Sequence, residues 1–462
     1  MAKYKAYPEY KDSGVEWLGM VPESWGVSRL KHVASIYGRI GFRGYTVDDI
    51  VGEGEGAIVL SPSNIVDEKF SLEKKTFLRW GKYFESPEII VTENDILLVK
   101  TGSTYGKSTI IKILTEPMTI NPQMALIKKV VIEPRFLAYW FNASLIKAKI
   151  EIANTGSGMP TMTQENINNF PVLIPHTKQD VLIADFLDHE TAKIDNLIEK
   201  QQQLIELLKE KRQAVISHAV TKGLNPDVRM KDSGVEWLGE VPEHWRVSRI
   251  KNYAKIASGH TPSKTKPEYW TNCNIPWVSL NDSKQLKNID YIEDTFYKIS
   301  ELGMANSSAH LLPTRAVVFT RDASIGLSAI TTQPMAVSQH LIAWLCDEKF
   351  IIPEFLLLVF YAMEEEFERY TFGATIKTIG MDNVRGLKSA FPPVEEQNEL
   401  IIWAFNKIEN IKSSISKVED MISLLQERRT ALISAAVTGK IDVRDWVAPN
   451  ACEAEVSQEV TA

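Results

Sequence analysis

The sequence predicts two α/β (α+β) domains that form a pseudo-twofold internal repeat and are joined by two long antiparallel coiled-coil helices. Two observations carry this prediction. A tryptophan-rich motif occurs twice, and an apolar heptad pattern closes each half of the chain. An internal repeat has to be identified before any local feature is interpreted, because each copy of the repeat must form one structural unit.

The repeat is strongest at the start of each half. Residues 11–31 read KDSGVEWLGMVPESWGVSRLK and residues 231–251 read KDSGVEWLGEVPEHWRVSRIK, so that 17 of 21 positions are identical. The stretch at 207–217 returns at 424–434. Between these matching ends the two halves differ strongly. Matching frames with divergent middles indicate one scaffold that carries two different binding surfaces.

The middle of each half reads as mixed α/β material. Short apolar runs bounded by Asn, Asp, Gly and Pro predict buried strands. These runs are 89–91, 96–99 and 124–127 in the first half and 316–319 and 341–344 in the second. Stretches that open with a proline predict helices, because proline suits the first helical turn. These stretches are 134–152 and 353–370.

The end of each half predicts a long helix, because apolar residues recur there at spacings of three and four over about four heptads. At about 1.5 Å per residue, a helix from Lys178 to Val220 would extend ~60 Å. Each helix either packs on its own domain alone or pairs with the other helix. The narrow apolar seam favours an antiparallel pair of helices, which would hold the two domains a fixed distance apart like a ruler. The expected helix–helix packing residues are Ile194, Ile198, Ile205, Leu208, Val215, Ile411, Ile415, Val418, Ile422, Leu425 and Leu432.

These patterns divide the chain into five segments. We expect a first domain at 1–176, a proximal helix at 177–221, a second domain at 222–394, a distal helix at 395–440 and a disordered acidic tail at 441–462. The tail ends ACEAEVSQEVTA, a composition too poor in large apolar residues to form a core. The repeated tryptophans lie in a domain core or on a partner surface, and the average burial of tryptophan favours the core. They are Trp17, Trp25, Trp237 and Trp245.

The composition of the chain argues against membrane-spanning, secreted and metal-binding classes of protein. A hydrophobic content of 44% and a charged content of 24% are ordinary for a globular protein. The longest apolar runs fall well short of the ~20 residues that span a bilayer. The N-terminus lacks the apolar core of a signal peptide. Three cysteines occur without metal-ligand spacing. We therefore expect a cytoplasmic protein with no membrane contact, disulfide or metal site.

Known catalytic motifs are absent from the sequence. Residues 101–108 read TGSTYGKS, which is similar to a phosphate-binding loop, but Gly102 and Gly106 enclose three residues where that loop needs four. The corresponding stretch of the second half, 321–328, has no lysine. There is also no adenine-methyltransferase tetrapeptide and no histidine pair at metal-ligand spacing. We expect no catalytic residue in this chain.

The divergent middles contain basic and aromatic side chains near glycines, which bring the backbone close to a ligand. Lysine suits phosphate contacts, and arginine suits bidentate contacts with bases. Any single lysine is more simply a solvated surface charge, so the prediction concerns the clusters. The DNA-binding candidates are Arg39, Arg43, Tyr45, Lys74, Lys75, Arg79, Lys82, Ser103, Tyr105, Lys107, His260, Thr261, Ser263, Lys264, Lys266, Tyr269, Arg321, Ser324 and Lys377.

From about Lys11 to Val443, the chain resembles the DNA specificity subunits of type I restriction–modification systems. Four features carry the resemblance: the doubled tryptophan motif, SGHTP at 258–262 with IPWV at 275–278, DILLVKTGS at 95–103, and the start of each long helix. At those starts Ile174-Pro175 precedes Gln179, and Pro392-Pro393 precedes Gln397.

The resemblance implies two target-recognition domains that each read one half of a bipartite double-stranded DNA sequence. It implies assembly with two modification subunits, which bind S-adenosylmethionine and flip out the target adenine, and with motor-nuclease restriction subunits that use ATP and Mg²⁺. No cofactor is then expected on this chain. Its net charge of −7 argues against strong DNA affinity without partners, because phosphate contacts need positive charge.

Two other interpretations remain open at this stage. A self-contained DNA-modifying enzyme is disfavoured by the missing motifs. A coiled-coil interaction protein without nucleic-acid function would explain the long helices but not two divergent polar domains. Activity of the purified chain alone would favour the first alternative, and sequence-selective DNA binding by an assembled complex would exclude the second.

Overall fold

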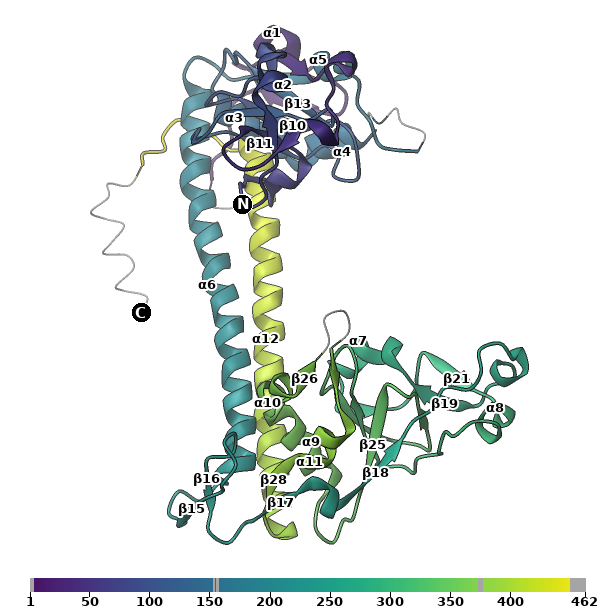
Figure 1. Ribbon diagram of the computed structural model, residues 1–462. Coiled ribbons are helices and arrows are strands. Elements are labelled where there is room, and N and C mark those ends of the chain that lie inside the picture. Colours follow the sequence, from purple (N-terminus) through teal and green to yellow (C-terminus); the bar gives the residue numbers. More distant parts are fainter. Residues whose placement is uncertain (1–3, 153, 155–157, 373–376, 449–462) are drawn as a thin grey trace. The chain divides into compact units, whose positions relative to one another are not determined.

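The computed structural model describes residues 4–152, 154, 158–372 and 377–448 (Figure 1). The chain divides into two compact units. One comprises the residues up to Gln201 together with those from Asp420 onward, and the other runs from Gln202 to Glu419. Each unit therefore contains one mixed α/β domain, part of the first long helix and part of the second. The unit boundaries cross both long helices.

The first unit is built on two four-stranded sheets. One is antiparallel, in the order β11-β10-β13-β4, and the other, in the order β12-β6-β9-β5, pairs β12 and β6 in parallel. The first sheet consists of β4 (Ser35–Gly38), β10 (Ile96–Val99), β11 (Ser108–Ile110) and β13 (Met124–Lys128). The second consists of β5 (Ile50–Val51), β6 (Gly56–Leu60), β9 (Phe77–Arg79) and β12 (Met118–Ile120). Apolar residues between the sheets, including Leu97, Val99 and Met124, form a separate core.

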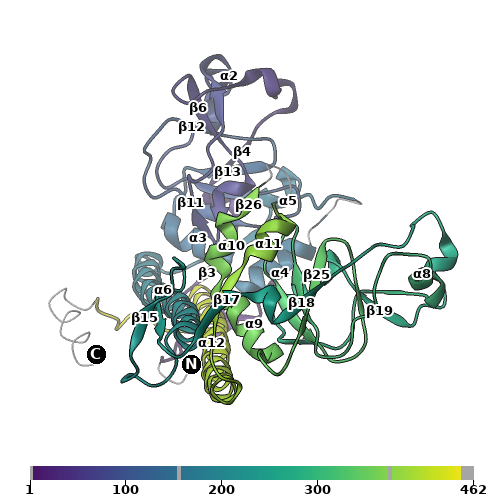
Figure 2. The same cartoon turned by 60° about the horizontal axis from the view of Figure 1, so that its bottom comes forward.

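The second unit also contains two sheets, but they have five and three strands, and β20 pairs in parallel with β23. Its larger sheet has the order β18-β25-β22-β23-β20, and its smaller sheet, β21-β19-β24, again contains one parallel pair. In Figure 2, β19 and the nearby α8 (Glu301–Ala305) lie beyond the larger sheet. The larger sheet consists of β18 (Ala254–Ser258), β20 (Tyr291–Ile292), β22 (Val317–Thr320), β23 (Ser328–Thr331) and β25 (Leu341–Cys346). The smaller one consists of β19 (Ile275–Val278), β21 (Tyr297–Ile299) and β24 (Ala336–Val337).

Short two-stranded pairs frame each domain. The tryptophan motif forms β1 with β2 in the first unit and β15 with β16 in the second, in equivalent registers. The strand that follows the motif pairs with the strand that precedes a long helix, as β3 with β14 and β17 with β28. These strands are β1 (Tyr10–Asp12), β2 (Met20–Pro22), β3 (Gly26–Arg29), β14 (Pro171–Ile174), β15 (Met230–Asp232), β16 (Glu240–Pro242), β17 (Arg246–Arg249) and β28 (Lys388–Phe391).

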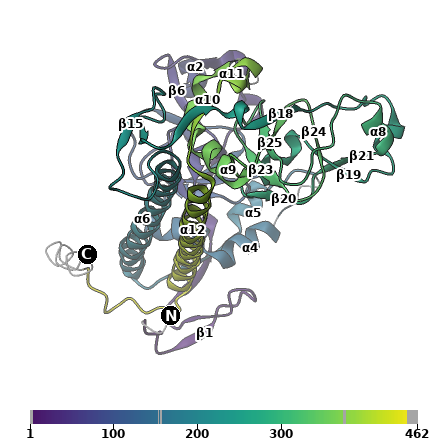
Figure 3. The same cartoon turned by 90° about the horizontal axis from the view of Figure 1, so that it is seen from below.

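Both predicted long helices are present, as α6 (Gln179–Thr221) and α12 (Val394–Val437). Within each unit the two helical segments lie side by side (Figures 1 and 3). In the first unit, Ile183 and Ile194 of α6 share one core with Leu425 and Leu432 of α12. All eleven predicted packing positions are buried or half-buried, whereas Leu204 and Leu207, off the seam, are exposed. The heptad pattern thus predicts which face of each helix is covered.

Most predicted strands are present, but the strand predicted at 89–91 is wrong. Pro87–Ile89 forms a short 3-10 turn, η4, since proline fixes its own φ and supplies no N–H to a sheet. The apolar character of this stretch reflects burial, because Ile89 and Val91 are almost fully enclosed. One backbone bond, from Val91 N to Met118 O at 3.0 Å, ties it to β12.

The two proline-led helices are each broken in two. The first becomes α3 (Pro134–Asn142) and α4 (Ser144–Ile152), separated by Ala143 in an extended conformation with ψ 138°. The next amide, Ser144 N, donates to Ser434 Oγ at 2.9 Å instead of continuing the helix. The second becomes α9 (Pro353–Ala362) and α10 (Glu364–Arg369). At the first of these breaks a tertiary contact therefore overrides a continuous helical pattern.

Trp25 and Trp245 are fully buried, which confirms the predicted core location for these two residues. Trp17 and Trp237 pack against the same cores but remain partly accessible. The prediction of a disordered tail is wrong for its first residues, because Ile441 and Val443 are buried. Residues 449–462 of that tail lie outside the described residues.

Candidate nucleic-acid interface

Three loops meet at the end of β10 in the first domain. Lys100 N donates to Gln123 O at 2.9 Å, which joins the loop after β10 to the β12–β13 connection. Met162 N donates to Lys100 O at 2.9 Å, which adds a third loop. Burial lowers the pKa of Lys100, so that its ammonium group is held in a partly desolvated setting. This junction presents polar side chains on a rigid sheet end.

The same junction recurs in the second domain. Arg321 N donates to His340 O at 2.9 Å, and Ile379 N donates to Arg321 O at 3.0 Å. Ala323 N donates to Lys377 O at 2.8 Å, so the predicted residues Arg321 and Lys377 belong to one loop cluster. The backbone frame is therefore repeated, whereas the side chains on it differ.

His260 also lies beside this second junction. Its backbone N–H donates to Val337 O at 3.1 Å, at the start of the connection that leads to His340. A side chain at Gly259 would collide with the carbonyls of Val337 and Ser338, so the glycine permits this close approach. The predicted residues Ser263, Lys264 and Lys266 are exposed on the loop that follows.

Other candidates lie on or near these loops, and they differ in exposure and in their contacts within the chain. Tyr105 donates to Ile150 O at 2.8 Å, and burial raises the pKa of its phenol. Thr261 and Tyr269 are half-buried, as is Ser324. Ser103 and Lys107 are exposed on the loop after β10.

Arg39 lies inside the first domain, with only 4% of its surface exposed. Its Nε donates to Ile120 O at 2.9 Å and its terminal NH2 to Thr119 Oγ1 at 3.0 Å. Its NH1 donates to Arg43 O at 3.3 Å, and its guanidinium lies over Tyr45, 5.4 Å from the ring centre. Arg39 thus supports the loop that carries Arg43 rather than forming part of the surface.

The remaining basic candidates of the first domain reach the surface, mostly beside acidic partners. Arg43 lies 3.4 Å from Glu88. Lys75 pairs with Glu116 at 2.6 Å and Lys82 with Glu85 at 2.8 Å, while Arg79 pairs with Asp49. Lys74 is exposed. DNA would have to compete with these carboxylates for each paired cation.

An exposed aromatic pair adjoins these cations. Trp80 and Phe84 on α2 (Trp80–Phe84) stack at 6.0 Å, and 64% of Phe84 is exposed. Phe84 is not among the residues predicted from the sequence. The helical spacing of four between the two aromatics was the available signal.

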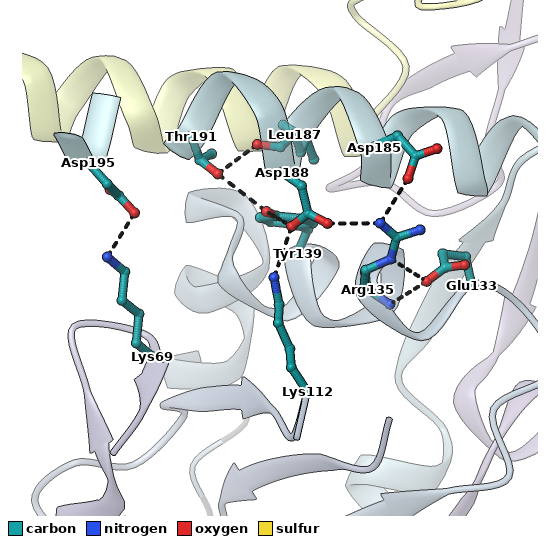
Figure 4. Close-up of polar contacts among 10 residues, drawn as sticks. All are labelled: Lys69, Lys112, Glu133, Arg135, Tyr139, Asp185, Leu187, Asp188, Thr191 and Asp195. Carbon is teal, nitrogen blue, oxygen red and sulfur yellow. Dashed lines mark hydrogen bonds and ion pairs between the residues drawn. The ribbon is translucent and has the colours of Figure 1, made fainter. Parts of the chain in front are cut away.

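A polar network fastens the first domain to α6 (Figure 4). Arg135 NH1 lies 2.8 Å from both Asp185 and Asp188, and Tyr139 donates to Asp188 at 2.8 Å. Lys112 lies 3.2 Å from Asp188. Burial alone would raise the pKa of Asp188, but the hydrogen bonds from Arg135 and Tyr139 outweigh it and hold that pKa below its usual value.

A second ionic contact between domain and helix occurs in both units, but the sign of the charge on the helix is reversed from one unit to the other. Asp195 of α6 pairs with Lys69 of the first domain at 2.9 Å and with Arg429 of α12 at 2.9 Å. The repeat-equivalent position on α12, Lys412, pairs with Asp290 of the second domain at 3.1 Å. Each domain thus carries a charge complementary to its own helix. The sequence does not predict these pairs, because their members lie more than 100 residues apart.

Among the described residues, no helix is long and apolar enough to cross a membrane. The same part of the chain contains no group of three or more His, Cys, Asp or Glu side chains placed to hold a metal ion.

Several known proteins resemble this chain. The putative type I restriction enzyme MjaX specificity subunit of Methanocaldococcus jannaschii is 22% identical over 441 residues, which cover 92% of this chain and 96% of that protein. The type I restriction enzyme StySPI specificity subunit of Salmonella potsdam is 21% identical over 459 residues, covering 94% and 92%. A shorter match, 25% identical over 191 residues, spans 44% of the MjaIX specificity subunit of M. jannaschii.

Two solved structures share the fold. A chain from a structure that describes complex assembly and conformational transition of the type I R-M system matches with a TM-score of 0.68 and 14% identity, covering 91% of this chain and 99% of that chain. The HsdS subunit from Thermoanaerobacter tengcongensis matches with a TM-score of 0.51 and 14% identity, covering 91% and 98%.

The sequence profile of one family matches both halves of the chain. It is described as the type I restriction modification DNA specificity domain, and it matches residues 22–207 and 242–419. Since these two matches cover most of both repeats, this chain belongs to the family of type I restriction–modification DNA specificity proteins.

Proposed function

We propose that this chain is the sequence-specific DNA-recognition subunit of a type I restriction–modification complex. Each α/β domain reads one half of a bipartite double-stranded target. The observation that carries the proposal is the repeated loop junction, where Lys100 and Gln123 in one domain correspond to Arg321 and His340 in the other. The same backbone frame with different polar side chains suits two readers of different base sequences.

We further infer that α6 and α12 pair as an antiparallel coiled coil that holds the two readers a fixed distance apart. In the first unit, Trp25 contacts Gln179 at the start of α6, and a side chain at Gly439, just after α12, would touch Trp25. In the second unit, Trp245 contacts Glu396 at the start of α12 and lies beside Gly223, just after α6. Each tryptophan therefore adjoins the start of one helix and the end of the other, as an antiparallel pair requires.

The chemistry of the proposed complex resides on partner subunits in the cytoplasm. Two modification subunits bind S-adenosylmethionine and transfer its methyl group to a flipped-out adenine. Motor-nuclease subunits use ATP and Mg²⁺ for restriction. This chain is non-catalytic and decides where the partners act. Since its net charge is −7, we expect the partners to supply much of the phosphate contact.

The test is the pattern of methylated adenine in the genome of the source cell, with and without this chain. The proposal predicts one bipartite motif whose methylation disappears when the chain is removed and returns when it is restored. Persistence of every methylated motif without the chain would contradict it. Methyl transfer or DNA cleavage by the homogeneous chain alone would instead indicate a self-contained enzyme.

A further inference from the structure

We propose that Asp322 and His340 form a base-reading pair in the second domain. The buried Asp322 carboxylate orients the His340 ring, and His340 Nε2 accepts a hydrogen bond from the exocyclic amino group of adenine or cytosine in the major groove. This inference rests on the proposed function and assigns part of one half-site to two named side chains.

The geometry fixes which ring nitrogen faces outward. His340 Nδ1 lies 2.6 Å from Asp322 Oδ2, and 42% of the His340 side chain is exposed against 12% for Asp322. A carboxylate can only accept, so Nδ1 carries the proton, and in the tautomer with Nδ1 alone protonated Nε2 is an acceptor. Gln339 Nε2 lies 3.5 Å from His340 Nε2, beyond a strong hydrogen bond, so a ligand can displace it.

Unsatisfied polar atoms surround this pair. Asp322 Oδ1, Arg321 Nε and Ser338 Oγ are all buried and have no hydrogen-bond partner within the described part of the chain; Asp322 Oδ1 has only a 4.0 Å ion pair with Arg321 NH2. All three belong to the two segments joined by the bond from Arg321 N to His340 O. Buried polar atoms without partners cost free energy, and such a concentration at one exposed junction indicates a polar ligand.

The first domain supports a role in discrimination between sequences. Gln123 occupies the position that corresponds to His340, and Thr101, which forms a bridge with Thr161 as Asp322 does with Thr378, corresponds to Asp322. The bond from Lys100 N to Gln123 O joins these two segments of the first domain, as the bond from Arg321 N to His340 O does in the second. The second domain thus has the oriented imidazole of His340 at the position where the first domain has the side-chain amide of Gln123. A histidine acceptor and a glutamine amide recognise different base edges.

The experiment uses the chain assembled with its modification subunits and measures methylation of target libraries randomised in each half-site. His340→Ala should lower discrimination at one position of the second half-site by about tenfold. Asp322→Asn should reverse the ring, because the asparagine amide can donate to Nδ1 and the proton then moves to Nε2. That variant should shift the preference at the same position from adenine or cytosine toward guanine or thymine. Gln123→Ala is the matched control and should alter the first half-site alone.

Unchanged selectivity of His340→Ala at the second half-site would overturn the pair, and so would an equal loss on all sequences, which indicates phosphate contact or misfolding. If Asp322→Asn fails to assemble, His340→Gln decides, because its amide must change the preferred base at that position. A wild-type complex that selects no DNA sequence would contradict the proposed function itself. A selective wild-type complex with unaffected variants contradicts only the assignment of this pair.

Discussion

Trp25 Nε1 donates a hydrogen bond to Gln179 Oε1 at 3.0 Å, which joins the N-terminal motif to the first turn of α6. The second half repeats the contact between Trp245 and Glu396 at 3.1 Å. The repeated motif is therefore a structural clamp on the long helices. Its presence in both halves follows from the need to hold two helix starts in the same way.

Replacing Trp25 with phenylalanine removes this donor and part of the buried ring. The expected cost is about 1–3 kcal/mol of local stability. Hydrogen exchange should accelerate at the start of α6 and the end of α12, near Gly439. Trp245→Phe is the matched control and should accelerate exchange near Glu396 and Gly223 instead. Equal effects of both variants on both regions would contradict the clamp.

Asp195→Lys places a third positive charge beside Lys69 and Arg429. We expect the β7 (Ile65–Val66) and β8 (Lys69–Phe70) hairpin to open more often, at a cost of roughly 1 kcal/mol because the pair is partly exposed. Hydrogen exchange at these strands measures the opening. Lys69→Glu in the same chain should restore protection, whereas failure of this rescue would show that the charges are incidental.

The opposite reversal, Lys412→Asp, is the control for that experiment. It faces Asp290 in the second unit and should affect exchange there while the first-unit hairpin stays unchanged. A response of the hairpin to Lys412→Asp would contradict the view that each domain is seated on its own helix by its own charge pair.

Asp188 makes the attachment of the first domain sensitive to acid. Its pKa in the folded protein is lowered despite burial, by hydrogen bonds from Arg135 and Tyr139. Its contribution to stability is therefore present above the unfolded pKa near ~4 and is lost as pH falls through the lower folded value. Asp188→Asn should lower the apparent melting temperature at pH 7, and its difference from wild type should shrink below about pH 4. A difference that is constant with pH would assign the effect to packing.

Arg39 and Arg43 were both predicted to contact DNA, and the structure gives them different environments. Arg39→Ala should destabilise the domain by about 1–3 kcal/mol, because it strips partners from Ile120 O and Thr119 Oγ1. If Arg43 contacts a base, Arg43→Ala should relax only the first half-site, by ~1–3 kcal/mol, with melting little changed. Denaturation and methylation of a randomised library separate the two effects. Uniform weakening on all sequences would assign Arg43 to phosphate.

The sequence predicted those parts of the fold that depend on local periodicity or on the repeat. The heptad pattern identified the covered faces of α6 and α12, and composition identified β10 and β25 as buried strands. The prediction from sequence failed where residues far apart in the chain determine the local backbone conformation. Ala143 is extended because Ser144 N bonds to Ser434 Oγ, 290 residues away, and no local pattern carries that information.

The candidate site was predictable only in part, for the same reason. Arg321 and Lys377 were named from composition, and the fold brings their backbones together. His340 escaped notice because its partner, Asp322, lies on another strand end, 18 residues away. Arg39 was misjudged as a surface residue, since a sequence does not reveal that three acceptors surround its guanidinium.

The most direct test of the account lengthens both long helices by one heptad at equivalent points, after Gln202 in α6 and after Glu419 in α12. This insertion preserves the apolar seam and adds ~10 Å, or about three base pairs of DNA. The measurement is the methylation motif of the assembled complex. We predict that both half-sites keep their bases while the gap between them grows by about three base pairs. An assembled, active variant that keeps its original gap, or that reads different bases in either half-site, would contradict two readers held apart by a helical ruler.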